Sequence, residues 1–168
     1  GEPQAGNIAP AVEEDAQLLD QKGQDIFEKR FVPLMQRKAE DIYKDILKRL
    51  FNAEARQRLK LVNLKATDGE LAVRVGTSEP FALINIGDAA GFFKTATDEP
   101  TFDTESDDFG GGLFGAINSN QSPLNILIGS RKFTEGWSSW RVSTMGLLNM
   151  GAGEGSQIIQ LFGRGVRL

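Results

Sequence analysis

Between residues 59 and 86 the chain carries three short apolar runs separated by turn signals. Residues 59–65 alternate in part between apolar and polar side chains, and Leu71–Val75 continues this pattern after the turn. The turn contains Asp68 and Gly69, a pair typical of tight hairpins. Residues 81–86 are almost wholly apolar, as expected of a buried strand. The sequence therefore predicts a sheet that includes an antiparallel hairpin.

The C-terminal half is predicted to contain both strands and helices. Leu124–Ile128 and Val142–Leu148 are strand-like, Leu113–Asn118 is a short helix candidate, and Ser156–Phe162 is predicted to be a helix with Ser156 as its N-cap. Strand, loop, strand, loop, helix is the order found in open α/β sheets. In such sheets, ligands bind beyond the carboxyl ends of the strands.

Ahead of these strands, residues 35–51 form the clearest helical pattern. Apolar side chains recur there at spacings of three and four, with charged side chains on the other face. We expect residues 1–56 to be an N-terminal helical segment of linker or packing helices, and residues 57–168 to be the α/β domain. Residues 95–112 are acidic and glycine-ended with little periodicity, and they are predicted to be a long mobile loop.

Composition removes several kinds of chemistry. The 168 residues include no cysteine and no histidine, so disulfides, thiol nucleophiles, histidine bases and cysteine–histidine zinc sites are excluded, and no metal site is predicted. No apolar run approaches the roughly 20 residues of a membrane helix. No signal peptide is recognisable, and a cytoplasmic location without membrane contact is expected. The chain begins Gly1-Glu2-Pro3 without an initiator methionine, as a fragment would.

Charge is distributed unevenly along the chain, whose net charge is −4. Residues 88–112 hold seven acidic side chains against Lys94. Residues 128–168 hold five basic side chains against two acidic ones. A basic C-terminal segment on an acidic protein can form an anion site.

The chemistry-bearing residues lie close to the C-terminus, in the segment Gln160-Leu161-Phe162-Gly163-Arg164-Gly165-Val166-Arg167. Two arginines three apart lie near each other on a helix. A guanidinium is permanently charged and forked, which suits phosphate oxygens, and in phosphoryl transfer it neutralises charge that builds on the γ-phosphate. On its own, such a pair is more often a solvated face.

Together with an upstream segment, these residues resemble the second lobe of superfamily 2 helicases. Gln160–Arg167 is similar to motif VI, and residues 126–137 are similar to motif V, which follows a buried strand. The form Glu135-Gly136-Trp137, with the final Gly163-Arg164-Gly165-Val166-Arg167-Leu168, looks closest to the restriction (Res) subunit of type III restriction enzymes. The resemblance covers residues 124–168. It implies a RecA-like C-terminal lobe, α/β with a mainly parallel sheet flanked by helices. The hairpin is then expected as an antiparallel addition at a sheet edge.

For the nucleotide site, the resemblance implies a role for each matching position. Arg164 and Arg167 would be arginine fingers that reach across a cleft, and Gln160 would couple the nucleotide site to the lobe interface. Gly163 would lie against the nucleotide. Many relatives have an acidic residue that touches the ribose where this chain has Ser138, which makes Ser138 a weak nucleotide ligand.

For the nucleic acid, the resemblance implies backbone contacts from the motif V segment. Ser130 stands at the position of the hydroxyl that contacts a phosphate, with Thr134 and the backbone of Gly136 at the same strand-end surface. The basic Arg131 and Lys132 belong to this predicted set. Such contacts position a phosphate without reading sequence. Trp137 and Trp140 could stack on a base, but packing of the motif V segment against the lobe is the more ordinary role.

Two motifs are missing from the 168 residues. There is no Gly-x-x-x-x-Gly-Lys-Ser/Thr P-loop and no Asp-Glu box after a strand. In this family both belong to the first lobe, so ATP and Mg²⁺ are expected only in a full-length parent protein. This chain is expected to be inactive alone. The implied partners are the first RecA-like lobe, DNA, and a modification methyltransferase subunit.

Three functions therefore stay open from the sequence. The first is a lobe of an ATP-dependent DNA helicase or translocase of the type III restriction kind. The second is a non-catalytic module that binds nucleic acid or protein, with residues 95–112 as a docking arm. The third is a lobe of an RNA helicase, because motif V and VI contacts go to the backbone and do not distinguish RNA from DNA.

Overall fold

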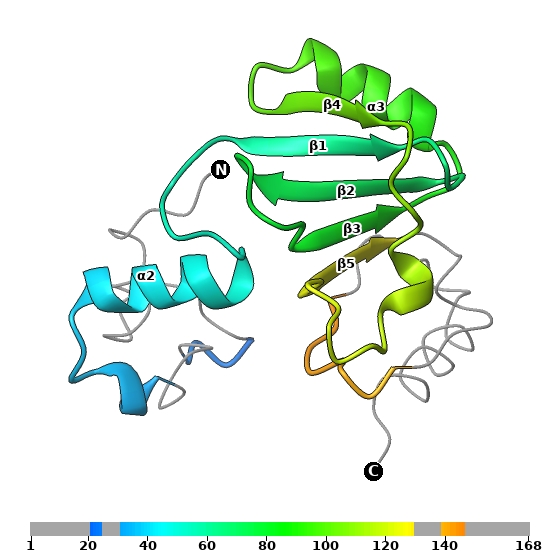
Figure 1. Cartoon of the computed structure of the whole chain (residues 1–168). Helices are drawn as coiled ribbons and strands as arrows, with labels where there is room; N and C mark the ends of the chain where they lie inside the picture. The colour runs from blue at the N-terminus through cyan, green and yellow to red at the C-terminus, as the bar shows by residue number, and fades with distance from the viewer. Residues whose placement is uncertain (1–20, 25–30, 130–138, 147–168) are drawn as a thin grey trace. The chain divides into compact units, whose positions relative to one another are not determined.

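The computed structural model describes residues 21–24, 31–129 and 139–146, and it divides the chain into two compact units, Gly1–Arg56 and Gln57–Leu168 (Figure 1). The described part of the first unit contains a 3-10 turn, η2 (Val32–Leu34), and helix α2 (Ala39–Leu50). The second unit contains the sheet and is treated separately.

Helix α2 confirms the helix predicted over residues 35–51, but it begins four residues later. Pro33 starts the separate η2 turn, and the extended backbone of Lys38 then separates the two elements. Glu40 and Asp41 in the first turn, with basic residues in the last, complement the helix dipole. The helix ends at Leu50, and Asn52, two residues later, has a φ of +51°, a left-handed conformation that Asn tolerates.

The second unit is an α/β fold, as predicted. Its described residues form a five-stranded sheet in the order β4-β1-β2-β3-β5. The strands and helices in chain order are β1 (Leu59–Leu64), β2 (Glu70–Val75), β3 (Ala82–Asn85), α3 (Ala89–Asp98), β4 (Asp103–Asp107), η3 (Phe114–Ala116) and β5 (Ile126–Gly129). Strand β2 runs against its neighbours β1 and β3, whereas β1–β4 and β3–β5 are parallel pairs.

The predicted hairpin is present as β1 and β2, and Gly69 adopts the positive φ of +80° that a tight turn favours. Its predicted place at a sheet edge is wrong, because β2 is the central strand. Strand β2 is buried on both faces at Leu71 and Ala72, which are 0% and 1% exposed. A strand apolar on both faces needs a neighbour on each side.

Two crossovers link the parallel strands. The chain passes from β3 to β4 through α3, and it returns from β4 to β5 through η3 in the opposite direction across the sheet (Figure 1). Leu113 and Phe114 of the second crossover pack on a core cluster formed by Val62, Leu64, Ala72, Leu83 and Leu124.

The prediction of a mobile loop over residues 95–112 is wrong. The segment contains the last turn of α3 and all of β4. An acidic strand is stable at this position because β4 lies at an edge of the sheet, where charged side chains reach solvent or a partner. Glu105 has two basic partners on β1 and β2, Lys60 and Arg74.

Two further elements differ from their predictions. The helix predicted over residues 113–118 is the short 3-10 turn η3. The strand predicted over residues 142–148 is absent from its described part, residues 142–146, which are non-regular and largely exposed. Apolar residues there have no neighbouring strand among the described ones, because the described sheet ends at β5.

Candidate functional site

The candidate site lies at the carboxyl ends of the parallel strands. Strands β1, β3, β4 and β5 all run in one direction, so their carboxyl ends meet at one edge of the sheet. Asn85 and Gly129, the last residues of β3 and β5, are partners in the parallel register. This is the edge at which open α/β sheets bind ligands. Residue 130, the first of the predicted phosphate contacts, directly follows Gly129.

Two buried polar side chains lie at this edge. Glu70 and Asn85 are register partners on β2 and β3 and are 5% and 2% exposed. The Glu70 carboxylate accepts hydrogen bonds from the amides of Leu113 and Phe114, at 2.7 and 3.3 Å. Glu70 therefore fastens the second crossover to the sheet. The Asn85 Oδ1 atom is buried with no hydrogen-bond partner.

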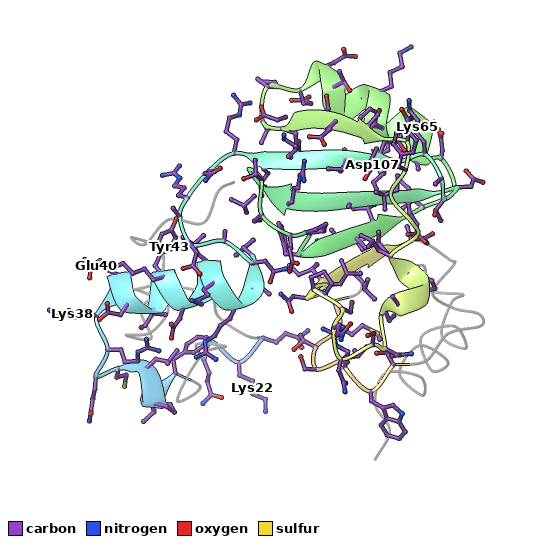
Figure 2. The ribbon with its side chains drawn as sticks, viewed as in Figure 1. Lys22, Lys38, Glu40, Tyr43, Lys65 and Asp107 are labelled. Carbon is purple, nitrogen blue, oxygen red and sulfur yellow. The ribbon has the colours of Figure 1, made fainter. Side chains whose placement is uncertain are left out.

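A tight turn follows β4 at the same end of the sheet, where Figure 2 labels Lys65 and Asp107. The Asp107 carboxylate accepts hydrogen bonds from the amides of Phe109 and Gly110, at 3.0 and 2.8 Å. These bonds, that of Phe109 first, lower the pKa of Asp107 from its ordinary value. Phe109 projects from the turn and is 96% exposed. Lys65 pairs with Asp108 at 2.9 Å.

Residues 139–141 form a second anchored turn. The Arg141 guanidinium donates to three main-chain carbonyls of the second crossover, those of Ile117 at 2.7 Å, Ser122 at 3.3 Å and Leu124 at 2.9 Å. The hydroxyl of Ser139, which is 6% exposed, accepts a hydrogen bond from the Arg141 amide at 3.2 Å. Trp140, between these two residues, is 80% exposed. The prediction that Trp140 packs against the lobe is therefore wrong.

The site residues that the sequence predicts all lie outside the described ranges. They are Gln160, Gly163, Arg164 and Arg167 of the motif VI segment, and Ser130, Arg131, Lys132, Thr134, Gly136 and Ser138 of the motif V segment. The predicted helix over residues 156–162 and Trp137 also lie outside them. The structure describes instead β5, which is the first part of the motif V segment, and the Ser139–Arg141 turn that follows the segment.

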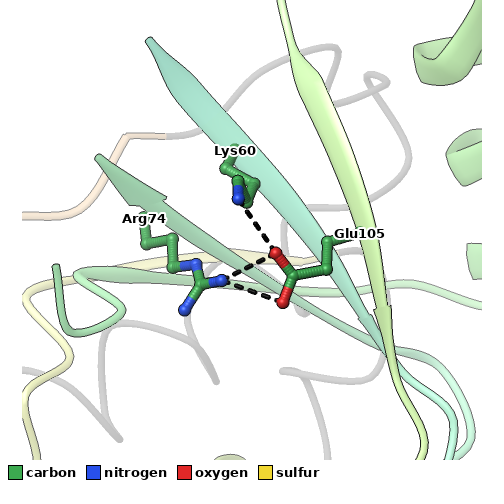
Figure 3. A network of polar contacts seen from close by, with 3 residues as sticks. All are labelled: Lys60, Arg74 and Glu105. Atoms are coloured by element: carbon green, nitrogen blue, oxygen red, sulfur yellow. Dashed lines mark hydrogen bonds and ion pairs between the residues drawn. The ribbon is translucent and has the colours of Figure 1, made fainter. Parts of the chain in front are cut away.

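A charged network lies on the sheet away from this edge, and Figure 3 shows it. The Glu105 carboxylate of β4 accepts a hydrogen bond from Lys60 Nζ at 2.9 Å. Arg74 Nη2 donates to both of its oxygens, to Oε1 at 2.9 Å and to Oε2 at 2.8 Å. The hydrogen bond from Lys60, followed by that from Arg74, lowers the pKa of Glu105 below 4.5. The Arg74 Nε is buried with no hydrogen-bond partner. The network joins the edge strand β4 to β1 and β2 through side chains, so we assign it a role in the fold.

Sequence reasoning missed Asn85, Asp107 and the anchoring role of Arg141. For Asp107, a usable signal was present: acidic residues at 103, 105 and 107 follow the period of two that marks a strand. Asn85 is the single polar residue within the apolar run 81–86, and that interruption was a usable signal. No local pattern marks Arg141, because its acceptors lie 17 to 24 residues earlier in the chain.

Among the described residues, no group of three or more acidic side chains is arranged to hold a metal ion. No helix in that part of the chain is both long and apolar enough to cross a bilayer. Comparisons of the chain with protein-family models, with curated proteins and with solved structures each find no match.

Proposed function

We propose that this chain provides the second, RecA-like motor lobe of an ATP-dependent nucleic-acid translocase of superfamily 2, similar to the restriction subunit of type III restriction enzymes. The observation that carries the proposal is the ordered pair of motif-like segments, residues 126–137 and Gln160–Arg167. Arg164 and Arg167 would then act on ATP and Mg²⁺ held by a first lobe, because the chain has no P-loop of its own. DNA is the nucleic acid that we propose it moves along.

The described geometry supports the motif V half of this proposal. Residues 126–129 are a strand, as motif V requires, and this strand is parallel to β3. Strand β5 therefore ends, at Gly129, at the carboxyl ends of the parallel strands, which is where a phosphate site is expected in such sheets. Ser139 and Arg141 fix the chain just after the same segment.

The test uses a longer polypeptide that joins this chain to a P-loop lobe. Replacing Arg164 or Arg167 with Ala should lower nucleic-acid-stimulated ATP hydrolysis by about 10³-fold or more, because the finger stabilises charge only in the transition state. Arg49→Ala, on the last turn of α2 in the other unit, is the matched control and should leave the rate unchanged. Rates near wild type for both finger variants would refute the assignment.

One observation favours a second candidate, a non-catalytic binding module. The central strand β2 is antiparallel to its neighbours, which departs from the wholly parallel sheet expected of a plain RecA-like lobe. A module of this kind would bind nucleic acid or protein through the same strand-end edge and the exposed Phe109 turn. It would bind its partner without any dependence on ATP, Arg164 or Arg167.

A further inference from the structure

We propose that the outer edge of strand β4, with the turn that follows it, is a docking site for an extended basic segment of another protein. The segment would add to the described sheet as a further strand beside β4. Three features support this site: the main chain of β4, the charges beside it and the exposed side chain of Phe109. The site is independent of the proposed motor role, because none of its residues belongs to the motif V or motif VI segments.

The main chain of β4 has hydrogen-bonding groups that face away from the sheet. Strand β4 is an outer strand of the described sheet, in which it pairs with β1 alone (Figure 1). The Asp107 carbonyl accepts from the Lys65 amide at 3.0 Å, so the main chain of Asp107 faces β1. Main-chain groups of successive strand residues point to alternate sides, so those of Thr104 and Ser106 face outward. These groups make no hydrogen bond to any residue that the structure describes.

This edge has little steric protection among the described elements. Helix α3 contacts β4, β1 and β2, so it lies against a face of the sheet rather than along the outer edge. Edge strands are commonly kept from further pairing by a proline or a bulge. Residues 103–107 contain no proline and pair with β1 in a continuous register. Two outward amides and two outward carbonyls are therefore available to an added strand.

The charge beside β4 determines which segment can pair there. Residues 98–108 contain six acidic side chains and no basic one. Asp103 and Asp108 pair with Arg58 and Lys65 at 3.1 and 2.9 Å, but their carboxylates remain 47% and 59% exposed. A second copy of this chain would bring another acidic strand, and a nucleic acid would bring phosphates, so both are repelled. A segment rich in lysine or arginine is attracted.

Phe109 provides an apolar contact at one end of this edge. The Asp107 carboxylate accepts from the amides of Phe109 and Gly110 at 3.0 and 2.8 Å, which fixes the turn directly after β4. The Phe109 side chain is 96% exposed. An apolar side chain of the added strand that covers this ring would contribute hydrophobic stabilisation beyond the main-chain hydrogen bonds. The expected partner is thus an extended basic segment with an apolar residue near Phe109.

The first experiment measures amide hydrogen exchange by NMR in the full 168-residue chain. The probe is a synthetic peptide of about eight residues, a usual strand length, in which lysine and valine alternate. We expect it to slow exchange of the Thr104 and Ser106 amides, and to change little at Glu105 and Asp107, whose amides face β1. The same peptide with glutamate in place of lysine should protect none of them.

Variants then separate main-chain pairing from the other contributions. Ser106→Pro removes an outward amide and none that faces β1, so the sheet should form while peptide affinity falls about 3- to 10-fold, as expected for one main-chain hydrogen bond. Ser106→Ala keeps the amide, and this matched control should bind like the parent. Phe109→Ala should weaken binding about 10-fold.

A second peptide tests main-chain pairing without altering the protein, in case circular dichroism shows that Ser106→Pro does not fold. The lysine–valine peptide with every main-chain amide N-methylated keeps its charges but cannot add as a strand. It should leave the Thr104 and Ser106 amides unprotected in the parent chain. Protection equal to that by the unmethylated peptide would overturn the inference.

Other results would also overturn it. These are equal protection by the lysine and glutamate peptides, no protection by the lysine peptide at about 1 mM, or parental affinity in a folded Ser106→Pro variant. Protection of Thr104 and Ser106 by oligothymidylate alone would assign the edge to nucleic acid, and protection on raising the concentration of the chain alone would assign it to a second copy. Neither ATP nor Arg164 enters these measurements, so failure here leaves the motor proposal standing.

Discussion

Replacing Glu105 with Gln tests whether the charged network on the sheet stabilises the fold. The substitution keeps the side-chain shape but removes the charge that Lys60 and Arg74 share, at 2.9 and 2.8 Å. An exposed ion pair contributes about 0–1 kcal/mol. Here the Lys60 and Arg74 side chains are only 22% and 23% exposed, although Glu105 itself is 42% exposed. Discounting for that exposure, we expect a loss of about 1–2 kcal/mol at pH 7.

The stabilisation that Glu105 provides should depend on pH in a defined direction. The folded pKa of Glu105 is lowered by its bonds to Lys60 and Arg74, so folding is favoured while the carboxylate is charged. The stabilisation is fully present above the unfolded pKa, near 4.5. It is lost as pH falls through the lower folded pKa. The difference in unfolding free energy between the parent and Glu105→Gln should therefore be largest at neutral pH and should vanish in strong acid.

The assay is urea unfolding followed by circular dichroism at neutral pH and again in strong acid. Asp108→Asn is the matched control, because it breaks a carboxylate–lysine pair, with Lys65, whose two side chains are 59% and 52% exposed. That pair should contribute well under about 1 kcal/mol. Equal losses for Glu105→Gln and Asp108→Asn, or a Glu105→Gln loss that does not shrink in acid, would contradict the reasoning.

Three other substitutions have defined outcomes. Asp88→Ala removes the N-cap that accepts from the Gly91 amide at 2.9 Å, so α3 should lose about 0.5–2 kcal/mol, seen as faster hydrogen exchange in α3 alone; unchanged exchange would count against the cap. Leu83→Ala, at a position 0% exposed in the core cluster, should lower the unfolding free energy by about 2–5 kcal/mol, whereas Val32→Ala, at a position 51% exposed, should cost far less. Arg141→Ala should speed proteolysis within residues 139–146, with Arg141→Lys intermediate because a single ammonium cannot reach all three carbonyls; protection equal to the parent would show that these bonds do not hold the turn.

The elements that local pattern decides were predictable. Helix α2, the β1–β2 hairpin and strand β3 each follow from periodicity and turn residues within about ten positions. The position of β2 at the centre of the sheet could not be predicted in this way, because it depends on pairing with both β1 and β3. Strand β4 was missed for the same reason. Its acidic residues favour a loop locally, and they are stabilised by Lys60 and Arg74, which precede Glu105 by 45 and 31 residues.

The candidate site divides in a similar way. The strand predicted over residues 124–128 is confirmed as β5, residues 126–129, although its side chains are half-buried or exposed rather than buried. The anchoring of residues 139–141 was not visible, since Arg141 bonds to main-chain carbonyls, which carry no residue identity in the sequence. For the same reason, packing of Trp140 against the lobe was the wrong expectation. The fate of an aromatic side chain depends on which neighbours are fixed, and that is a tertiary property.

The most direct test of the proposed motor function is steady-state ATP hydrolysis, with saturating nucleic acid, by a polypeptide that joins this chain to a P-loop lobe. Arg164→Lys and Arg167→Lys keep the charge but lose the forked geometry of the guanidinium. The proposed role predicts that kcat falls by orders of magnitude for each variant while KM for ATP changes little, because the fingers act on the transition state. A kcat equal to that of the parent in both variants would contradict it.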